Sequence, residues 1–512
     1  MTDWLPELDS AYARLRFCSC CDGRTFEEGS DSPERSNDHA TVTCTVRCGL
    51  ISLFIAGKLG LSIPESKCKE FAPGDPGLPV PRVIVVGGGF GGLYAARGLK
   101  NAPVDVTLID KRNYHLFRPM LYQVATGLLS ADQISGALRS ILSHQKNADV
   151  LMDEVTGINA NERTVQLGQR ALSYDFLILA TGIRYNYFGH DEWRSFAPGL
   201  ESLDDADVIR GRILLAFERA EELAYLGHAD SHAIQRELTF ALVGAGTVGV
   251  EMASTLAEMS RMALARDFRH IDPASARILL FEAGPRVLPT YPETLSTKAQ
   301  RHLESLGVRV RTNARVTDVG ADGIVVNGEP VAAGTVLWSA GVVASPIGRW
   351  LKTPTDSYGK VIVGPDLSVP EYPEVFAIGD TAHLVAPARN LLGIRSRAAM
   401  VMPGVAQPAI QGGEYVAEVI RRRVEQRPAP APFCYWDKGD LAIVGRTYAV
   451  ADLRFVRFAG LLAWLLWAMV HIYSLIGFAN RLFVLLQWGF TFLTKRRRVR
   501  VFPTLRPSPE SD

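Results

Sequence analysis

The sequence predicts an α/β fold built around two copies of one strand–turn–helix unit, followed by an apolar C-terminal tail. The copies are "PRVIVVGGGFGGLYAARGL", which begins at Pro81, and "LTFALVGAGTVGVEMASTLAEM", which begins at Leu238. In each copy an apolar strand runs into a glycine-rich turn and then into a helix, as in a parallel sheet with crossover helices. The tail, from Arg454 onward, is rich in Leu, Trp and Phe and carries the basic run KRRRVR at 495–500.

Length and charge narrow the class of protein. A chain of 512 residues exceeds a single core and suggests about two to four domains. Its 55 basic and 54 acidic residues give a net charge of +1, so no global field favours a nucleic-acid partner. No secretory signal opens the chain, and the expected compartment is the reducing cytoplasm.

Residues 1–80 differ in composition from the rest of the chain, and we expect an irregular, disordered N-terminal extension. Its Cys18-x-x-Cys21 and Cys44-x-x-x-Cys48 pairs have spacings compatible with a four-thiolate zinc site. We favour the extension without metal, and predict no metal site elsewhere in the chain.

The first glycine turn carries the G-x-G-x-x-G spacing of a Rossmann-type dinucleotide site. Gly87, Gly89 and Gly92 follow the strand VIVVG directly, and Asp110 ends the next predicted strand, VDVTLID. Glycines let the backbone approach a pyrophosphate at a helix N-terminus, and the acid accepts hydrogen bonds from ribose hydroxyls. Strand, helix and acid together predict dinucleotide binding.

The second turn repeats the pattern with Gly244, Gly246 and Gly249, and its acid is Glu282 at the end of RILLF. An acid here favours the free 2′-hydroxyl of NADH over the 2′-phosphate of NADPH, although the nearby Arg286 softens that expectation. Two unequal sites in one chain predict FAD at the first and NADH at the second.

Glu251 lies in the first turn of the helix after the second glycine turn. The helix dipole alone favours a carboxylate at that position. The alternative, which we prefer, places Glu251 beside the nicotinamide as a catalytic residue.

Three later apolar runs end in small residues and are interpreted as buried strands that return to the nucleotide sites. They are YDFLILATG, which ends in Thr181 and Gly182, AGTVLWSAG, which ends in Gly341, and EVFAIGD, which ends in Asp380. In flavoproteins with two dinucleotide sites, an aspartate at the place of Asp380 bonds the flavin ribityl chain; the alternative is an ordinary turn aspartate.

These elements predict the domain organisation. The FAD-binding domain comprises residues 81–200 and 342–430 and is interrupted by an NADH-binding domain at 201–341. A membrane-associated region occupies 431–512. We expect FAD to be held without a covalent bond, because no cysteine or histidine has a position that we can assign to flavin attachment.

Cysteine positions exclude a thiol relay. Six of the seven cysteines precede residue 69, and the remaining one is Cys434. Disulfide reductases and sulfide:quinone oxidoreductases need cysteines near the flavin, so the flavin here is expected to pass electrons directly to an acceptor.

At this point the sequence resembles the type II, non-proton-pumping NADH:quinone oxidoreductases, especially those of actinobacteria, from about residue 82 to 500. NYHLFRPMLYQVATGLLS is similar to the family's flavin-side loop, EAGPRVLPTYPETLS to its NADH strand, and GVAQPAIQGGEYVA to its quinone motif A-Q-x-A-x-Q. The resemblance implies that Gln407 and Gln411 face the quinone and that Ala406 and Ala409 keep its tunnel narrow. Without it, a helix of small residues with two glutamines is more often a packing element.

A quinone substrate gives the tail a purpose, because quinones are dissolved in the bilayer. Residues 458–480 contain no charged side chain and are long enough to span as one helix. Spanning would export the basic cluster against the positive-inside bias. We therefore expect monotopic helices on the cytoplasmic face, with Trp464, Trp467, Trp488 and the basic cluster at the level of anionic headgroups. A spanning helix at about 458–480 and a buried soluble helix are the alternatives.

The predicted function is oxidation of NADH and reduction of a membrane quinone through FAD, without proton pumping, in the respiratory chain. One alternative is an NAD(P)H-dependent reductase of a soluble acceptor such as a ferredoxin. Another is a membrane-docked flavin redox sensor or scaffold. The sequence leaves open the choice between menaquinone and ubiquinone and whether the chain forms a homodimer.

Overall fold

The computed structural model describes residues 43–44, 51–52, 80–227, 231–265, 267–494 and 501. It separates into one unit at Met1–Leu78 and a second at Pro79–Asp512. The first unit contributes only the strand pair β1 (Thr43–Cys44) and β2 (Ile51–Ser52) to this description, so the candidate zinc cysteines other than Cys44 lie outside the described residues. Within the described ranges, no group of side chains has the composition of a metal site.

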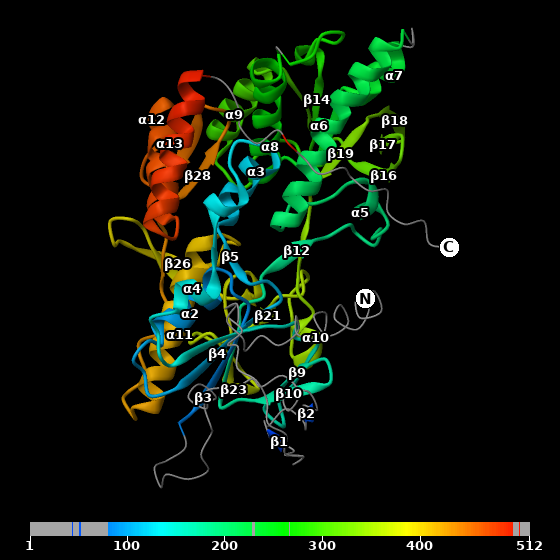
Figure 1. Cartoon of the computed structure of the whole chain (residues 1–512). Coiled ribbons are helices and arrows are strands. Elements are labelled where there is room, and N and C mark those ends of the chain that lie inside the picture. The colour runs from blue at the N-terminus through cyan, green and yellow to red at the C-terminus, as the bar shows by residue number, and fades with distance from the viewer. Residues whose placement is uncertain are drawn as a thin grey trace, which may run out of the picture. The chain divides into compact units, whose positions relative to one another are not determined.

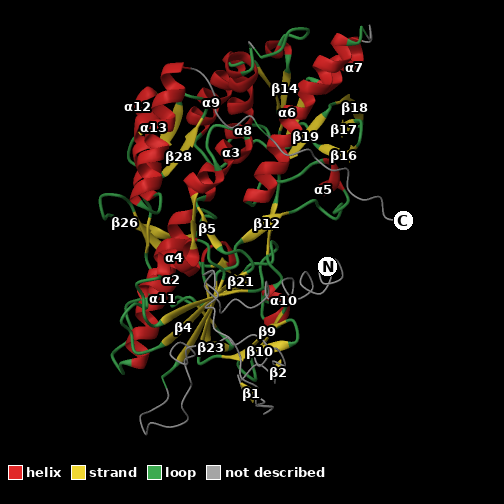
Figure 2. Cartoon of the chain, in the orientation of Figure 1, coloured by secondary structure: helices red, strands yellow, loops and turns green. Residues whose placement is uncertain are grey.

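The first large sheet of the second unit has six strands in the order β22-β23-β11-β3-β4-β7 (Figures 1 and 2). All neighbouring pairs are parallel except β22–β23. The strands are β22 (Ser368–Val369), β23 (Tyr372–Ala377), β11 (Phe176–Leu179), β3 (Arg82–Val86), β4 (Asp105–Asp110) and β7 (Ala148–Met152). Helix α2 (Phe90–Gly98) follows β3, and α11 (Ala406–Val424) packs on α2.

The second large sheet is fully parallel, in the order β15-β14-β13-β19. Its strands are β15 (Val308–Arg311), β14 (Arg277–Phe281), β13 (Thr239–Val243) and β19 (Thr335–Trp338), and α8 (Thr247–Glu258) follows β13. All four strands fall between β11 and β23 in the sequence. The predicted fold, one dinucleotide-binding domain inserted into another, is therefore confirmed, whereas the boundaries at 200 and 341 stay predictions.

Smaller elements connect and cover these sheets. The strands β12 (Ile183–Tyr185) and β20 (Val342–Ala344) pair antiparallel where the chain passes between the two domains. The covering helices and the small sheets are α3 (Leu121–Ala125), α4 (Leu138–Leu142), α5 (Trp193–Phe196), α6 (Leu203–Tyr225), α7 (Ser231–Glu237), α9 (Glu293–Ser305), α10 (Ile347–Leu351), β5 (Tyr114–Leu116), β6 (Ser135–Ala137), β8 (Gly157–Asn159), β9 (Thr164–Leu167), β10 (Arg170–Ser173), β16 (Val316–Gly320), β17 (Gly323–Val326), β18 (Glu329–Ala332), β21 (Val361–Ile362) and β24 (Ala382–His383).

The C-terminal region forms a three-stranded sheet and a helix pair. Its elements are β28 (Asp440–Ile443), β29 (Ala449–Asp452), β30 (Arg457–Gly460), α12 (Leu461–Ser474) and α13 (Phe478–Thr494). The alternative of one spanning helix at about 458–480 is wrong, because that stretch begins in β30 and is broken at Gly477, whose φ is +87°. Among the helices that the structure describes, none has the length and apolar content needed to cross a bilayer.

One face of this helix pair is part of the protein core. Ala463, Trp467 and Val484 belong to the same buried cluster as α3, α6 and α8. Trp467 is only 1% exposed, so the expectation that it lies at headgroup level is wrong. Its indole ring instead stacks on His471 and Trp488.

Candidate functional site

The first glycine turn has no room for side chains. Gly87 has a φ of +105°, and a Cβ on it would collide with the carbonyl oxygen of Ala180, the residue directly after β11. A Cβ on Gly92 would collide with the carbonyl of Gly87, so α2 can begin this close to β3 only with glycine there. Asp110 then locks the turn, because its carboxylate accepts hydrogen bonds from the Gly88 amide at 2.6 Å and the Arg112 amide at 2.8 Å.

The second turn reproduces this geometry. Gly244 has a φ of +98°, and its Cβ would lie 2.8 Å from the backbone of Ala340, while a Cβ on Gly249 would collide with the Gly244 carbonyl. Glu282 accepts hydrogen bonds from the amides of Ala245 and Gly284, both at 2.8 Å. Like Asp110, Glu282 thus accepts from one amide of the glycine turn and from the amide two residues after itself.

Both turns leave space on their outer side. Gly89 and Gly246 are the N-cap residues of α2 and α8, neither with a side-chain cap. A Cβ on either would meet nothing within 4 Å. The protein's own packing does not require glycine at these two positions, whereas a pyrophosphate over the helix N-terminus does.

Asp380 gives an independent test of whether a flavin nucleotide fits. Burial raises the pKa of Asp380 above its ordinary value, although the charges of Lys360 and Arg118 act in the opposite direction. Its Oδ1 is buried and has no hydrogen-bond partner among the described residues. A buried carboxyl oxygen without a partner is costly, and a ribityl hydroxyl would satisfy it. The residues present therefore fit FAD at the first site.

The strand ends near the first site are tied together by hydroxyl groups. The Thr381 hydroxyl accepts a hydrogen bond from the Gly182 amide at 3.0 Å, and the Thr181 hydroxyl lies 3.3 Å from that of Thr381. Gly341, at the second site, has a φ of +67°, and a Cβ there would lie 2.5 Å from the ring of Phe188. The ends of β11, β19 and β23 are thus each followed by a turn with a predicted site residue, namely Thr181, Gly341 and Asp380.

Glu251 is buried where α8 meets the C-terminal sheet. Burial raises the pKa of Glu251 well above its ordinary value, and a hydrogen bond from the Ile443 backbone acts in the opposite direction. A neutral carboxyl gains little from a helix dipole, so the dipole explanation loses its physical basis. The position beside the nicotinamide stays a prediction.

Helix α11, which carries the glutamine motif, is fitted tightly to the first site. A Cβ on Gly379 would lie 2.9 Å from the Cβ of Ala409, so both small residues are needed where α11 passes the Asp380 turn. The Gln407 side chain makes no hydrogen bond to the described residues. Gln411 differs, because its amide donates to the Trp436 carbonyl at 3.0 Å and accepts from the Trp436 amide at 2.8 Å.

Two features were missed in the sequence. Gln411 connects α11 to β27 (Tyr435–Trp436), a pairing that no local pattern indicates. Arg454, considered only as a charge flanking the tail, bonds three aspartates, Asp437, Asp440 and Asp452, at 2.7, 2.7 and 3.2 Å. All four side chains lie within residues 437–454, so the cluster ties the C-terminal sheet together internally. Tyr291 of the second domain lies within electrostatic reach of Asp440, Arg454 and Glu251.

An apolar cavity lies between α3, α8 and the two C-terminal helices. Its volume is about 70 Å³, and it opens to solvent. Trp464, Trp467 and Trp488 line one side, and Tyr122 and Gln123 of the flavin-side loop line another. The Trp488 indole donates to the Gln123 side chain at 2.8 Å, so the tail contacts this loop directly.

Two glycine cradles, the unpartnered Asp380 and the inserted parallel domain define a two-dinucleotide flavoprotein of the pyridine nucleotide-disulphide oxidoreductase class, whose family model matches residues 81–413. A second model, the NDH2 C-terminal domain, matches residues 437–497. The chain belongs to the type II NADH:quinone oxidoreductase family.

Individual relatives agree with this assignment. The type II NADH:quinone oxidoreductases NdhA and Ndh of Mycobacterium tuberculosis are each 43% identical to this chain; the alignments cover 81% of it and 88% and 89% of those proteins. Among solved structures, NDH2 from Plasmodium falciparum in complex with NADH superposes with a TM-score of 0.70 at 21% identity, over 81% of this chain and 99% of that one. At that identity the superposition supports the fold.

Proposed function

We propose that this protein oxidises NADH and reduces a membrane quinone through non-covalently bound FAD, without proton pumping, in the respiratory chain. The observation that carries the proposal is the presence of two dinucleotide cradles in one chain, with the N-terminal end of α11 abutting the Asp380 turn of the first site. When bound, FAD supplies the chemistry that accepts a hydride and releases two electrons to the acceptor.

The chain's own residues position and select the substrates. The Glu282 carboxylate, already held by two backbone amides, repels a 2′-phosphate and so favours NADH over NADPH. The nearby Arg286 donates to the Pro289 carbonyl at 2.9 Å, which directs its guanidinium group toward the backbone. Glu251 holds a proton at the junction of the second domain and the C-terminal sheet, where we place the nicotinamide.

At the quinone side, Gln407 is the residue we assign to the quinone, because its amide bonds to none of the described residues. The side-chain oxygen and nitrogen of Gln411 both bond to the backbone of Trp436. We therefore assign Gln411 a role in holding Trp436 in place, in addition to any contact with the quinone. Ala406 and Ala409 keep the passage along α11 narrow. The apolar cavity lined by Trp464 and Trp467 is the route we propose for the quinone tail.

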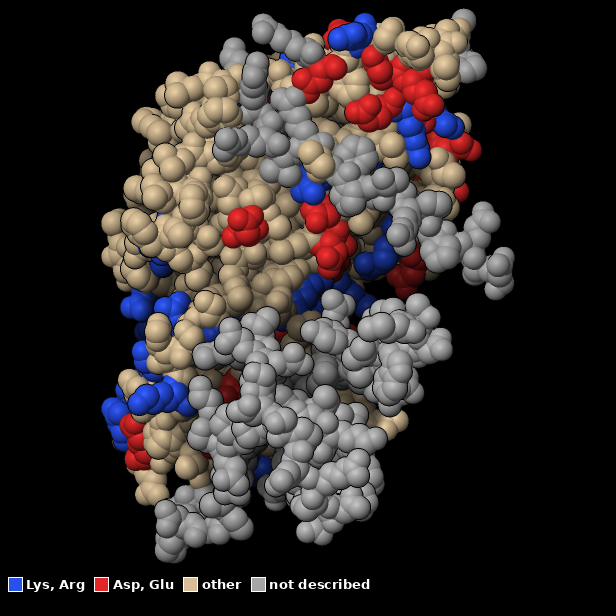
Figure 3. Space-filling view, in the orientation of Figure 1, with Lys and Arg blue, Asp and Glu red and all other residues tan. Residues whose placement is uncertain are grey.

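Membrane attachment is proposed through the outer face of α12 and α13. Leu462, Phe478 and Leu493 are 71%, 80% and 82% exposed, and Figure 3 shows few charged side chains over these helices. Burying such side chains in the interface of the bilayer is favourable, and the basic run at 495–500, outside the described residues, would add attraction to anionic headgroups. The cytoplasmic face is proposed because NADH is found there.

Steady-state oxidation of NADH by purified protein in liposomes tests the proposal. We expect turnover with a long-tailed quinone and a clear preference for NADH over NADPH. Rapid bleaching of flavin by NADH without reoxidation by any quinone would refute it, and turnover only with a ferredoxin would favour a soluble acceptor. Light scattering on the same sample tests for a homodimer.

A further inference from the structure

The hairpin of β25 (Val385–Arg389) and β26 (Arg395–Val401) presents apolar side chains on a well-defined turn. Leu391, Leu392 and Ile394 at its tip are 38%, 64% and 62% exposed. Asn390 fixes the tip, because its side-chain oxygen accepts hydrogen bonds from the amides of Leu392 and Ile394 at 3.1 and 3.0 Å. These side chains are therefore held outward by a closed turn and contribute nothing to a core.

The charged side chains of the hairpin segment itself are all basic; the acid next to it is Asp437, whose amide donates to the Arg389 carbonyl and whose carboxylate is paired with Arg454. No Asp or Glu occurs between residues 381 and 413. Arg389 and Arg395 flank the tip, one at the end of each strand, and both are exposed. Exposed aliphatic side chains between exposed basic side chains match the interface of an anionic bilayer, where the apolar groups enter and the cations meet headgroups.

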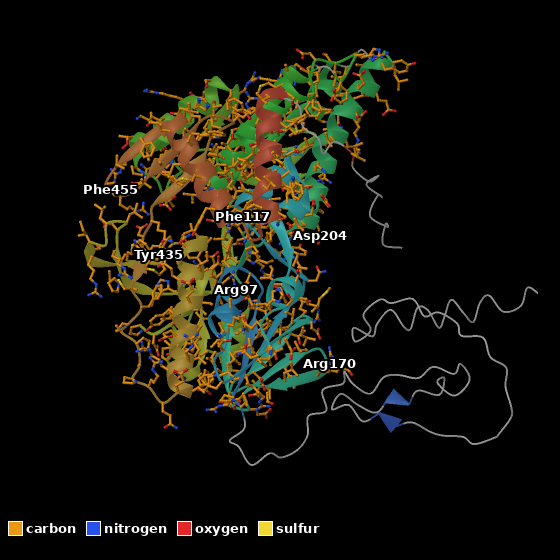
Figure 4. All side chains as sticks on the ribbon, turned by 60° about the vertical axis from the view of Figure 1, so that its left-hand side comes forward. Arg97, Phe117, Arg170, Asp204, Tyr435 and Phe455 are labelled. Atoms are coloured by element: carbon orange, nitrogen blue, oxygen red, sulfur yellow. The ribbon has the colours of Figure 1, made fainter. Side chains whose placement is uncertain are left out.

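The hairpin continues the surface already assigned to lipid. The turn between β29 and β30 exposes Phe455 and Val456, at 52% and 42%, and β30 leads directly into α12. Figure 4 shows Phe455 on the same side of the molecule as the hairpin, and Figure 1 draws the β26 hairpin beside the end of the α12–α13 pair. Two segments distant in sequence, the hairpin and the stretch from the β29–β30 turn through α13, thus expose apolar side chains on one side of the molecule.

The base of the hairpin belongs to the quinone side of the site. β25 follows Asp380 by five residues, and β26 is followed by α11 with Gln407. β27 pairs with β25, and its Trp436 is the residue that Gln411 holds. The same small sheet therefore reaches from the glutamine motif to the exposed tip.

We propose that the tip of this hairpin is a second membrane contact, which enters the anionic bilayer beside the place where the quinone leaves it. This inference rests on the proposed function, because it assumes that α12 and α13 dock on lipid. The hairpin adds a separate point of attachment, and two separated points fix the orientation of the glutamine motif relative to the membrane.

The test replaces the tip side chains and leaves Asn390 in place. The triple variant Leu391→Ser, Leu392→Ser, Ile394→Ser removes the apolar tip, and the matched control Tyr225→Ser, Leu226→Ser removes two exposed apolar groups at the end of α6. Partition of full-length protein onto anionic and neutral liposomes is measured by cosedimentation. We expect about tenfold or greater weakening for the triple variant and no change for the control.

Activity separates docking from chemistry. With a long-tailed quinone in liposomes the triple variant should show a raised KM, while flavin bleaching by NADH and turnover with a short, water-soluble quinone stay unchanged. Wild-type partition by the triple variant would overturn the inference. A changed oligomeric mass with unchanged partition would also overturn it, since the tip would then contact a second copy of the chain.

A tail variant, Leu462→Ser with Leu465→Ser, distinguishes this failure from failure of the proposed function. If that variant loses liposome binding and the hairpin variant does not, membrane docking by the tail stands and the hairpin inference falls. If the wild-type protein itself does not bind liposomes, the proposed membrane docking fails.

Discussion

Two adjacent glycines in α11 should respond in opposite ways to alanine. A Cβ on Gly413 would lie 2.9 Å from the Ala95 amide nitrogen and would collide with the Gly91 carbonyl, both in the backbone of α2. A Cβ on Gly412 would meet its nearest neighbour, Leu367, at 3.5 Å, which is an ordinary contact. Gly413→Ala therefore tests the contact between α11 and α2, and Gly412→Ala in the same helix is its control.

The magnitudes follow from two opposing effects. Alanine favours a helix over glycine by about 1 kcal/mol, so Gly412→Ala should raise the free energy of unfolding by up to about 1 kcal/mol. At Gly413 the neighbours are backbone atoms that cannot rotate away, and the Cβ would collide with the Gly91 carbonyl oxygen, so α11 must move away from α2. Overpacking of this kind costs about 1–3 kcal/mol, so after the gain in helix propensity Gly413→Ala should be net destabilising by up to about 2 kcal/mol.

The displacement also separates Ala409 from the Asp380 turn, so Gly413→Ala should weaken the retention of FAD. Thermal unfolding followed by flavin fluorescence, together with the flavin content after extended dialysis, measures both effects. Equal stability and equal flavin content in the two variants would show that α11 does not depend on this contact.

Three further changes test other parts of the site. Glu282→Gln should narrow the ratio of kcat/KM for NADH over NADPH, and an unchanged ratio would mean that another residue reads the ribose. Because burial raises the pKa of Glu251, its contribution to stability is complete below about 4.5 and is lost as the pH rises toward the folded-state value. Wild-type protein should therefore lose free energy of unfolding relative to Glu251→Gln as the pH rises above about 4.5; a constant difference in urea titrations over that rise would contradict a raised pKa. Trp467→Ala should cost about 3–5 kcal/mol while Leu462→Ala, on the exposed face of the same helix, stays within about 0.5 kcal/mol; equal costs would mean that the helix is not part of the core.

The dinucleotide sites could be predicted because their chemistry is local. A Cβ on Gly87 or Gly92 would collide with the backbone of the same strand–turn–helix unit or of the residue after the neighbouring strand. The spacing of the motif is therefore enough to predict that these two positions need glycine. Asp110 and Glu282 are found by their position at a strand end. Asp380 was found in the same way, from the short apolar strand before it.

The tertiary partner of Gln411 could not be predicted. Its two hydrogen bonds go to Trp436, which lies 25 residues later in the chain, and they exist because β27 adds to the edge of β25. A glutamine on a helix of small residues has the same local pattern whether it faces a substrate or a strand. The family resemblance indicates the first role, and the structure adds the second.

The tail shows why an apolar helix gives an ambiguous signal. Trp464 and Trp467 belong to one run without charged residues, so no polar stripe marks which face packs inward. The structure divides the run at Gly477 and buries Trp467, while Leu462 stays exposed. Hydropathy alone supported a spanning helix because it sums over both faces.

This division of faces has a mechanical consequence. α12 and α13 share a buried cluster with α8 and α3, and Trp488 is bonded to Gln123 of the flavin-side loop. When the outer face of these helices binds lipid, close-packed side chains connect the membrane contact to the nucleotide sites. Such packing is barely compressible, so a shift at the membrane contact is passed on to the sites. Deleting the tail would expose the core of the second domain as well as remove the membrane contact. Point changes on the outer face, such as those at Leu462 and Leu465, separate these two effects where truncation cannot.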